Sequence, residues 1–441
     1  MAHRLLIIQP SYYRSKRDRT VFKVRHRSVV PLTLPYLAAL TPPGWDVTLV
    51  DEQLDPVPAG DGFDLVAISC STLNSLRAYD LADQFRAHGV PVIIGGPHTF
   101  FHADEAGYHC DAVGVGEAET IWPRMLEEVL HGRLAKRYEA AVLSDLSDLP
   151  MPRYDLLDLK RYRPFRTHTV SASRGCPFRC EFCSERFLLG ERYRCRPVSD
   201  VIEEIKRCGS RSIFFGDSNF GGKRSHAMEL MGAMIPLRVR WSALWPSYLC
   251  SDSAFMDLAQ RSGLLHLNIG LESISPETLA SMNKNFNKTT KYAEMLAGLR
   301  RRNISYSLNF IFGWDGELES AFDATFRFLQ EHKVPVAYFN ILTPSRGTPF
   351  YERMRSEGRI LDEQEIDRWP GQLCYIRPPY GTPAALENRV RRMYREFYRL
   401  PSMISRLPLP VTQSSIASWV INFSQRRMAS AEDAHNNFDG Y

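Results

Sequence analysis

The chain has 441 residues, of which 44% are hydrophobic and 24% charged, a composition ordinary for a globular protein of two or three domains. Its formal net charge of +5 is small for this length and argues against a nucleic-acid-binding protein, which would concentrate basic residues on one face. No stretch reaches the ~18 apolar residues of a membrane span, and the N-terminus has too short an apolar core for a signal peptide. We therefore expect a cytoplasmic protein without a transmembrane segment.

Residues 1–135 alternate short apolar runs with helical patterns, which is typical of a parallel, doubly wound α/β sheet. The predicted strands are 5–9, 47–51, 65–69, 91–94 and 112–115. The predicted helices are 34–40, 76–88 and 117–130. The basic run from Arg14 to Arg27 is expected to be a solvated loop, and contact with an anionic cofactor tail or substrate is the alternative.

Three of the turns that follow these strands are rich in glycine and small polar residues. They are Ser69 to Thr72, Gly95 to His98, and Gly114 to Glu117. Ligands of doubly wound sheets bind at the carboxyl ends of the strands, and glycine lets the backbone approach a bulky ligand closely. Ordinary turn chemistry explains any one of these turns, but three on one edge indicate a ligand site.

Residues 136–165 are predicted to be a linker, because Pro150 and Pro152 favour extended backbone at a composition change. The alternation then resumes over 166–360. The predicted strands there are 170–172, 212–215, 239–244, 265–269, 306–312 and 336–341. The predicted helices are 198–208, 226–235, 254–262, 276–282, 289–301 and 318–332. Six βα units predict a partial (β/α)6 barrel of the TIM type, with its active site at the carboxyl ends of the strands.

Residues 361–441 are predicted to form a small, mostly helical C-terminal segment. A helix is expected at 389–399 and a helix or strand at 411–423, with a polar tail after them. This segment is either a cap that helps to shape the substrate pocket or a packing appendage.

The most distinctive motif is a run of three cysteines in one short loop. Cys176, Cys180 and Cys183 have the spacing C-x-x-x-C-x-x-C. Three thiols cannot form a disulfide framework, and soft thiolates favour zinc or an iron–sulfur cluster. Three local ligands would leave one iron of a 4Fe–4S cluster open to bind another molecule. A structural zinc with a distant fourth ligand is the alternative.

This motif resembles the signature of the radical S-adenosylmethionine (SAM) enzymes. The lead-in Ser173-Arg174-Gly175-Cys176-Pro177, and Phe182 before the last cysteine, resemble the subfamily that carries an N-terminal cobalamin-binding domain. The resemblance covers residues 1–350. It implies a Rossmann-like cobalamin-binding domain over 1–135, a linker over 136–165 and a radical SAM partial barrel over 166–360.

The same resemblance assigns SAM contacts to strand ends of the barrel. A zwitterionic cofactor with a ribose needs acceptors for its ammonium and hydroxyl groups and donors for its carboxylate. Arg196 matches a family arginine that holds the cofactor carboxylate, and a structural ion pair is the alternative. The full set of expected SAM contacts is Phe182, Arg196, Asp217, Ser218, Glu272 and Ser273.

The glycine turns resemble the cobalamin-binding half of the same enzymes. The expected cobalamin contacts are Ser69, Ser71, Thr72, Gly95, Gly96, His98, Gly116 and Glu117. The motif D-x-H-x-x-G, which supplies a histidine to cobalt in methionine-synthase-like proteins, is absent, and His98 does not match it. The resemblance therefore implies a cobalt whose lower face has no protein histidine, and the loop from Cys70 to Asn74 is the candidate for that position.

Together these resemblances imply a methyltransferase that acts on an unactivated carbon through a 5′-deoxyadenosyl radical and methylcobalamin. A cobalamin-dependent radical SAM cyclase or oxidase without net methyl transfer is the first alternative. A non-catalytic cobalamin or redox sensor is the second. The expected partners are a small-molecule or peptide side-chain substrate and an electron donor such as flavodoxin or ferredoxin; lipids and tetrapyrroles are among the substrates that fit.

Overall fold

The structure is a computed structural model, which describes residues 2–14, 19–60, 62–363, 365, 369–408 and 411–429. The chain divides into two compact units. The first contains Met1–Val170 with Leu188–Gly190 and Glu203–Ser210, and the second contains the remaining residues. The predicted polar tail lies outside the described residues, and the predicted domain boundaries stay a prediction.

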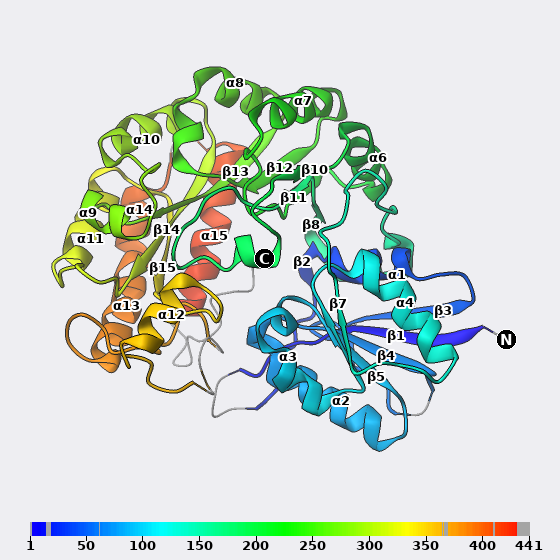
Figure 1. Ribbon diagram of the computed structural model, residues 1–441. Coiled ribbons are helices and arrows are strands. Elements are labelled where there is room, and N and C mark those ends of the chain that lie inside the picture. Colours follow the sequence, from blue (N-terminus) through cyan, green and yellow to red (C-terminus); the bar gives the residue numbers. More distant parts are fainter. Residues whose placement is uncertain are drawn as a thin grey trace. The chain divides into compact units, whose positions relative to one another are not determined.

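The first unit contains a six-stranded parallel sheet in the order β3-β1-β4-β5-β6-β7 (Figure 1). Its strands are β1 His3–Gln9, β3 Trp45–Asp51, β4 Leu65–Ser69, β5 Val92–Gly95, β6 Ala112–Val115 and β7 Arg137–Glu139. Its helices are α1 Thr33–Leu40, α2 Ser75–Ala87, α3 Pro97–His109 and α4 Ala118–Leu130. The sequence predicted five of these strands and three of these helices.

Both faces of this sheet are covered, as the apolar strands require. Leu5 and Ile7 of β1 pack in a core with residues of α1 and α4, whereas Leu6 and Ile8 pack in a second core with residues of α2 and α3. Successive side chains of a strand point to opposite faces, so one apolar run supplies both cores.

Three elements of this unit were not predicted. The strand β2, Arg27–Val30, begins at the end of the basic run that the sequence assigned to a loop. The helix α3 begins at Pro97, because the segment Gly95 to His98 is a strand-to-helix junction with proline in the first turn. The strand β7 pairs with β6 at residues that the sequence assigned to the linker.

The second sheet is a seven-stranded half-barrel in the order β15-β14-β13-β12-β11-β8-β2, one strand more than predicted. Its further strands are β8 Tyr162–Val170, β11 Ser212–Phe215, β12 Arg240–Leu244, β13 Leu264–Glu272, β14 Ser305–Phe312 and β15 Val336–Ile341. The first barrel strand was expected at 170–172, but β8 ends at Val170 and the cysteine motif follows a separate short strand.

Helices follow these strands along the chain, as in a βα barrel (Figure 1). They are α6 Val198–Cys208, α7 Arg224–Met234, α8 Ser253–Arg261, α9 Pro276–Ser281, α10 Tyr292–Arg301 and α11 Ala321–Glu331. The C-terminal helices are α12 Pro349–Ser356, α13 Pro383–Phe397, α14 Leu400–Arg406 and α15 Gln413–Ala429. The region 411–423 is thus helical, and α12 and α14 were not predicted.

Residues of β14 alternate between apolar and polar. Phe312 stacks on Phe322 of α11 with ring centroids 4.2 Å apart, on the helix-covered face. Ser305 and Ser307 alternate with the apolar residues and bond His266 of β13 on the other face, at 2.8 and 3.1 Å. β14 therefore turns an apolar face to α11 and a mostly polar face to the side of His266.

Candidate active site

The cysteine motif lies in a loop that begins with a two-residue strand. This strand, β9 Ser173–Arg174, pairs antiparallel with β10, Arg194–Cys195. Gly175 follows it with φ = +92°, a conformation that favours glycine. The loop then leads to the short helix α5, Glu185–Leu188. The chain turns sharply at Gly175 and brings all three cysteines into one segment.

Asp217, which follows β11, braces the start of this loop. Its carboxylate accepts hydrogen bonds from the Ala172 amide, at 3.2 Å, and from the Ser173 hydroxyl. Ser173 also lies 2.7 Å from the Tyr193 hydroxyl. Burial raises the pKa of Asp217 to about 6, although its hydrogen bonds oppose that rise. Asp217 therefore has a structural task, which is to hold the backbone where the cysteine loop begins.

The three thiols lie close enough to influence one another. Burial raises the pKa of each thiol, that of Cys183 to about 12, and neighbouring thiols add to the rise at Cys180 and Cys183. The ammonium of Lys284 opposes the rise at Cys176 and Cys180. Cys180 is buried, and Cys176 and Cys183 are half-buried. Thiols with raised pKa values need a cation to hold them as thiolates, which a metal cluster provides.

Glu272 ends β13 with a left-handed backbone conformation, φ = +65°. Its Oε1 lies 2.5 Å from Nζ of Lys284, and both side chains are about nine-tenths buried. Burial disfavours the Lys284 ammonium, but the Glu272 carboxylate outweighs this effect, and the pKa of Lys284 is raised. Its Nζ also lies 5.8 Å from the centre of the Phe182 ring and 5.6 Å from that of Phe286.

Sequence reasoning missed Lys284 as a member of this site. Lysine is rarely buried unless it is paired, and nothing in the local pattern after α9 distinguishes it from a surface lysine. Its pairing with Glu272, twelve positions earlier, appears only in the folded chain.

Asn219 is a second residue that the sequence did not single out. It is 2% exposed, and by strict geometry its amide oxygen and nitrogen make no hydrogen bond within the described part of the chain. Its side chain makes only a weak hydrogen bond with the Cys176 thiol, and this bond lowers the pKa of that thiol. A buried amide whose hydrogen-bonding capacity is not used lowers the stability of the fold, so this side chain is suited to bind a ligand.

The other predicted SAM contacts occupy the same unit but are held by different partners. Ser218 donates to the carboxylate of Glu185, and Ser273 accepts from the Ser275 amide at 3.1 Å. Phe182 meets Trp314 edge to face, with centroids 6.2 Å apart. Arg196 donates to the carbonyl oxygen of Ser171 at 2.8 Å, so at least part of its guanidinium braces the backbone before the loop.

These residues fit a 4Fe–4S cluster with SAM. The donor set is three soft thiolates in one loop, which is the ligand chemistry of such clusters. Around it lie the carboxylate of Glu272, the ammonium of Lys284 and the unsatisfied amide of Asn219. Such groups match a ligand that carries both an ammonium and a carboxylate.

The predicted cobalamin contacts lie along the carboxyl edge of the first sheet. Ser69 and Gly95 end the paired strands β4 and β5, and Gly116 follows β6 with φ = +91°. Glu117 is buried, and its carboxylate accepts from the Ser144 amide at 2.7 Å. At Gly96, where φ is +103°, a Cβ would approach the Cys70 carbonyl oxygen to 2.6 Å. The close approach of the backbone at Gly96 to the backbone at Cys70 therefore requires glycine.

His98 lies inside this unit. Its side chain is fully buried, with Nε2 2.7 Å from the Tyr79 hydroxyl and Nδ1 3.2 Å from the Thr72 hydroxyl. Its ring stacks on that of His102, with centroids 4.5 Å apart. His98 and Thr72 are thus joined to each other, and His98 contributes to the packing of α3 against α2.

Asn74 organises the loop that was the candidate for the lower face of cobalt. Its side chain donates to the Pro10 carbonyl at 2.9 Å and accepts from the Ser71 amide at 2.8 Å. These bonds join the loops after β1 and β4, which is where the strand order reverses and where such sheets bind ligands. Ser71 is exposed at this point, and the small side chains suit a bulky cofactor.

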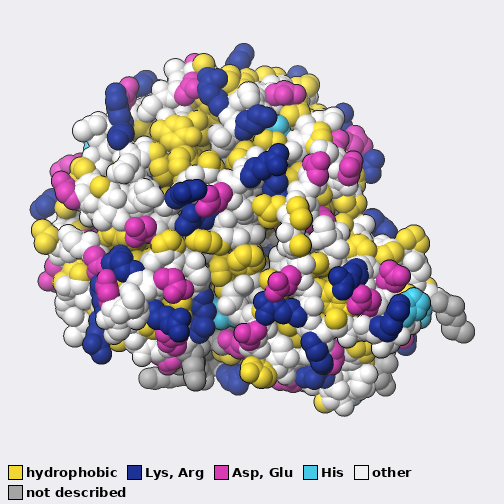
Figure 2. All heavy atoms as spheres, in the orientation of Figure 1, with side chains coloured by type: hydrophobic (Ala, Val, Ile, Leu, Met, Phe, Trp, Pro, Cys, Tyr) yellow, Lys and Arg dark blue, Asp and Glu magenta, His cyan; other side chains and the backbone are white. Residues whose placement is uncertain are grey.

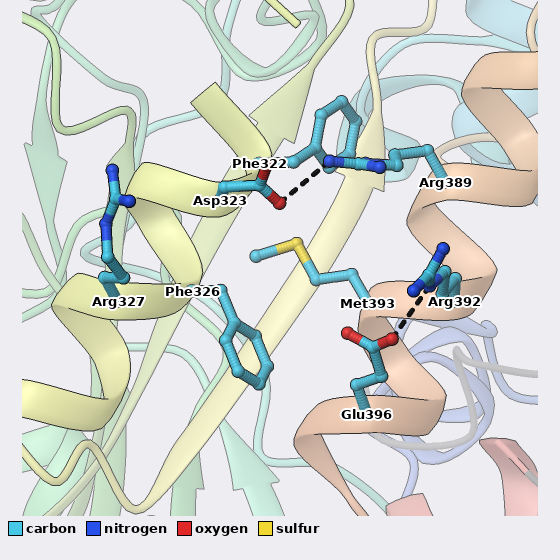
Figure 3. A pocket seen from close by; sticks show the side chains of 8 residues that line it. All are labelled: Phe322, Asp323, Phe326, Arg327, Arg389, Arg392, Met393 and Glu396. Carbon is cyan, nitrogen blue, oxygen red and sulfur yellow. Dashed lines mark hydrogen bonds and ion pairs between the residues drawn. The ribbon is translucent and has the colours of Figure 1, made fainter. Parts of the chain in front are cut away.

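A separate pocket of about 200 Å³ lies between α11 and α13 (Figure 3). Arg389 pairs with Asp323 across it at 2.8 Å, and Arg392 pairs with Glu396 at 2.8 Å. It involves none of the strand-end residues and is not part of the site described above.

Comparison with known proteins agrees with this arrangement. Residues 170–329 match the Radical SAM superfamily. The chain is 31% identical to the bacteriochlorophyllide d C-12(1)-methyltransferase of Chlorobaculum tepidum, over 96% of this chain and 92% of that protein. It is 27% identical to the bacteriochlorophyllide d C-8(2)-methyltransferase of the same organism, over 85% and 87%.

Two solved structures share the fold. The cobalamin-dependent SAM radical enzyme OxsB matches with a TM-score of 0.71 at 13% identity, over 97% of this chain and 72% of that chain. The radical SAM methyltransferase TsrM from Kitasatospora setae matches with a TM-score of 0.61 at 18% identity, over 81% and 76%.

The chain belongs to the cobalamin-dependent radical SAM methyltransferase family. It is a C-methyltransferase of that class, and its cofactors are a 4Fe–4S cluster, SAM and cobalamin. The predictions of fold class, cofactors and reaction type are thereby confirmed. Among the helices that the structure describes, none has the length and apolarity to cross a bilayer.

Proposed function

We propose that this enzyme methylates an unactivated carbon on a substituent of a chlorin, a reduced tetrapyrrole ring. The proposal is supported by the two bacteriochlorophyllide methyltransferases, each of which aligns with more than four-fifths of both chains. The sequence alone left the substrate open, because a lipid or a peptide side chain fitted equally well. The proposal narrows that range to a chlorin.

The observation that carries the reaction is the group of three thiols, one buried and two half-buried, beside the Glu272–Lys284 ion pair. In this proposal Cys176, Cys180 and Cys183 ligate the cluster. When bound, the cluster and SAM supply the radical that removes hydrogen from carbon, and methylcobalamin supplies the methyl group.

The residues of the chain bind, orient and shield these groups. Asp217 fixes the backbone at Ala172 and Ser173, so that the cysteine loop starts from a defined position. Glu272, Lys284 and Asn219 offer an acceptor, a donor and an amide to SAM. Burial of Cys180, which is 7% exposed, limits the access of water.

The remaining expected contacts belong to the same proposal. Phe182, Ser218, Ser273 and Arg196 complete the SAM site or its support. Ser69, Ser71, Thr72, Gly95, Gly96, Gly116 and Glu117 form the cobalamin edge, with His98 supporting it from within. Flavodoxin or ferredoxin is the proposed electron donor.

The test uses the anaerobically reconstituted enzyme, a chemical reductant and SAM with a deuterated methyl group. A chlorin with unmethylated side chains is expected to gain a labelled methyl group, detected by mass spectrometry, and Cys180→Ala is expected to abolish the gain. Label incorporated into a hopanoid lipid instead would overturn the chlorin assignment. A chlorin converted without label would support a cyclase or oxidase.

A further inference from the structure

The C-terminal helix α15 has its polar face inward and its apolar face outward. Its buried residues are Ser414, Ser415, Ser418, Asn422, Gln425 and Ala429. Its large exposed hydrophobic residues are Ile416, Val420 and Phe423, which are 48%, 50% and 50% exposed. A helix on a globular protein normally shows the reverse arrangement.

Specific hydrogen bonds fix this orientation. The Ser418 hydroxyl lies 2.8 Å from that of Ser305 at the start of β14, and Asn422 donates to the Pro335 carbonyl at 2.8 Å. Arg426 donates to the Tyr398 carbonyl at 3.2 Å. Rotating the helix to bury its apolar residues would break these bonds and leave buried polar groups without partners. The outward apolar face is therefore a stable feature of the fold.

The exposed residues form one continuous strip. Ile416, Val420 and Phe423 are three or four positions apart, which places them on one side of the helix. Val411, just before the helix, is 65% exposed. We call these four residues the apolar strip. A second exposed pair, Leu400 and Ile404, lies one turn apart on the preceding helix α14.

The helices α14 and α15 and the link between them carry only basic charges. Residues 397–429 contain four arginines, of which Arg406 is buried, and no aspartate or glutamate; in the sequence Glu396 precedes this segment and Glu432 and Asp433 follow it. Arg399 and Arg427 are exposed, and Arg426 is half-buried. On the face of the molecule that Figure 2 shows, basic and acidic side chains are mixed.

We propose that the apolar strip and its flanking arginines bind the surface of an anionic lipid bilayer. An apolar helix face that carries tryptophan or phenylalanine and is flanked by arginine is the combination by which helices lie in the bilayer interface. The hydrocarbon boundary takes up the strip, and anionic headgroups pair with the arginines. This proposal is independent of the substrate proposed above.

The charge pattern favours a bilayer over a second copy of the chain. A two-fold interface would bring together two segments that each contain arginines and no carboxylate. In such an interface, residues 397–429 of the other copy would offer no carboxylate to pair with these arginines, whereas anionic headgroups neutralise them.

The test is co-sedimentation of the full-length, reconstituted protein with vesicles. Binding is expected to phosphatidylcholine vesicles that contain phosphatidylglycerol, to be weak with phosphatidylcholine alone, and to decrease as ionic strength rises. The double variant V420D/F423D is expected to lower partitioning at least about tenfold. Arg427→Glu is expected to weaken binding to the vesicles that contain phosphatidylglycerol and to leave binding to pure phosphatidylcholine vesicles unchanged.

The matched control is Tyr108→Asp, which changes an 81% exposed residue of α3. It is expected to bind like the wild type, and circular dichroism verifies that each variant is folded. Equal binding of V420D/F423D and the wild type would overturn the proposal. A dimer in solution that V420D/F423D dissociates, without vesicle binding by the wild type, would assign the strip to a second copy instead.

Discussion

The ends of β11 and β13 carry the two carboxylates that were both predicted to contact SAM, at its amino group and its ribose, yet they are held very differently. Asp217 is committed to the backbone at Ala172 and to the Ser173 hydroxyl, so it stabilises the loop that carries the cysteines. Glu272 bonds a side chain and no backbone group among the described residues: its partner is Lys284, which itself lies next to the thiols. The comparison shows that a carboxylate at a strand end acts as a brace or as an available ligand, depending on what it faces.

The largest effect is expected from breaking the Glu272–Lys284 pair. Glu272→Gln leaves a buried ammonium without a counter-charge, which costs about 3–5 kcal/mol of unfolding free energy. Denaturant unfolding of the apo-protein measures it. The double variant E272Q/K284M removes both charges and is expected to recover most of this stability but not the affinity for SAM.

The exposed pair Lys291–Glu294 provides the control for that experiment. Glu294→Gln is expected to cost at most about 0.5 kcal/mol, because surface ion pairs contribute little. If Glu272→Gln behaved like this control, the buried pair would not be the support that we describe.

A smaller, pH-dependent effect is expected at Asp217. Its pKa is raised from 3.8 to about 6 in the folded chain, so the folded state binds its proton more tightly than the unfolded state does. Its contribution is therefore fully present below about pH 4 and decreases by at most about 3 kcal/mol as the pH rises to about 6. The stability difference between the wild type and Asp217→Asn, measured by denaturant unfolding from pH 4 to pH 7, is expected to follow this decrease. A difference independent of pH would show that Asp217 is not held as described.

The smallest effect on stability is expected at Asn219. Its buried amide makes only a weak hydrogen bond, to the Cys176 thiol, so the similarly shaped Asn219→Leu is expected to change the unfolding free energy by no more than about 1 kcal/mol. The affinity for SAM, measured by equilibrium dialysis, is expected to fall about tenfold if the amide bonds the cofactor. Loss of stability with unchanged affinity would make Asn219 a brace like Asp217.

The sequence predicted the regular parts of the fold because each carries its own pattern. The apolar runs at β4 and β15 have strand length and sit between helical patterns, so their ends could be placed within one residue. β2 was missed because Arg27 and Ser28 do not alternate as a buried strand does, and its partner β8 lies more than a hundred residues later. Pairing over that distance leaves no local trace.

The residues of the site likewise fall into two groups: those that a local sequence pattern reveals and those that only the folded chain reveals. The cysteine spacing and the residues at the strand ends could be read locally. Lys284 and Asn219 could not, because what distinguishes them is burial beside the thiols. The sequence likewise could not show that Asp217 holds Ala172 and Ser173, since that depends on how two strand ends meet.

The most direct test of the central claim is the iron content of the anaerobically reconstituted protein, with its absorption spectrum. We expect about four irons per chain in the wild type, and none above background in the variant with Cys176, Cys180 and Cys183 all replaced by alanine. The variant C110A/C250A/C374A, which removes three cysteines outside the motif, is the matched control and is expected to retain the cluster. A triple motif variant that keeps its iron and its spectrum would contradict the account.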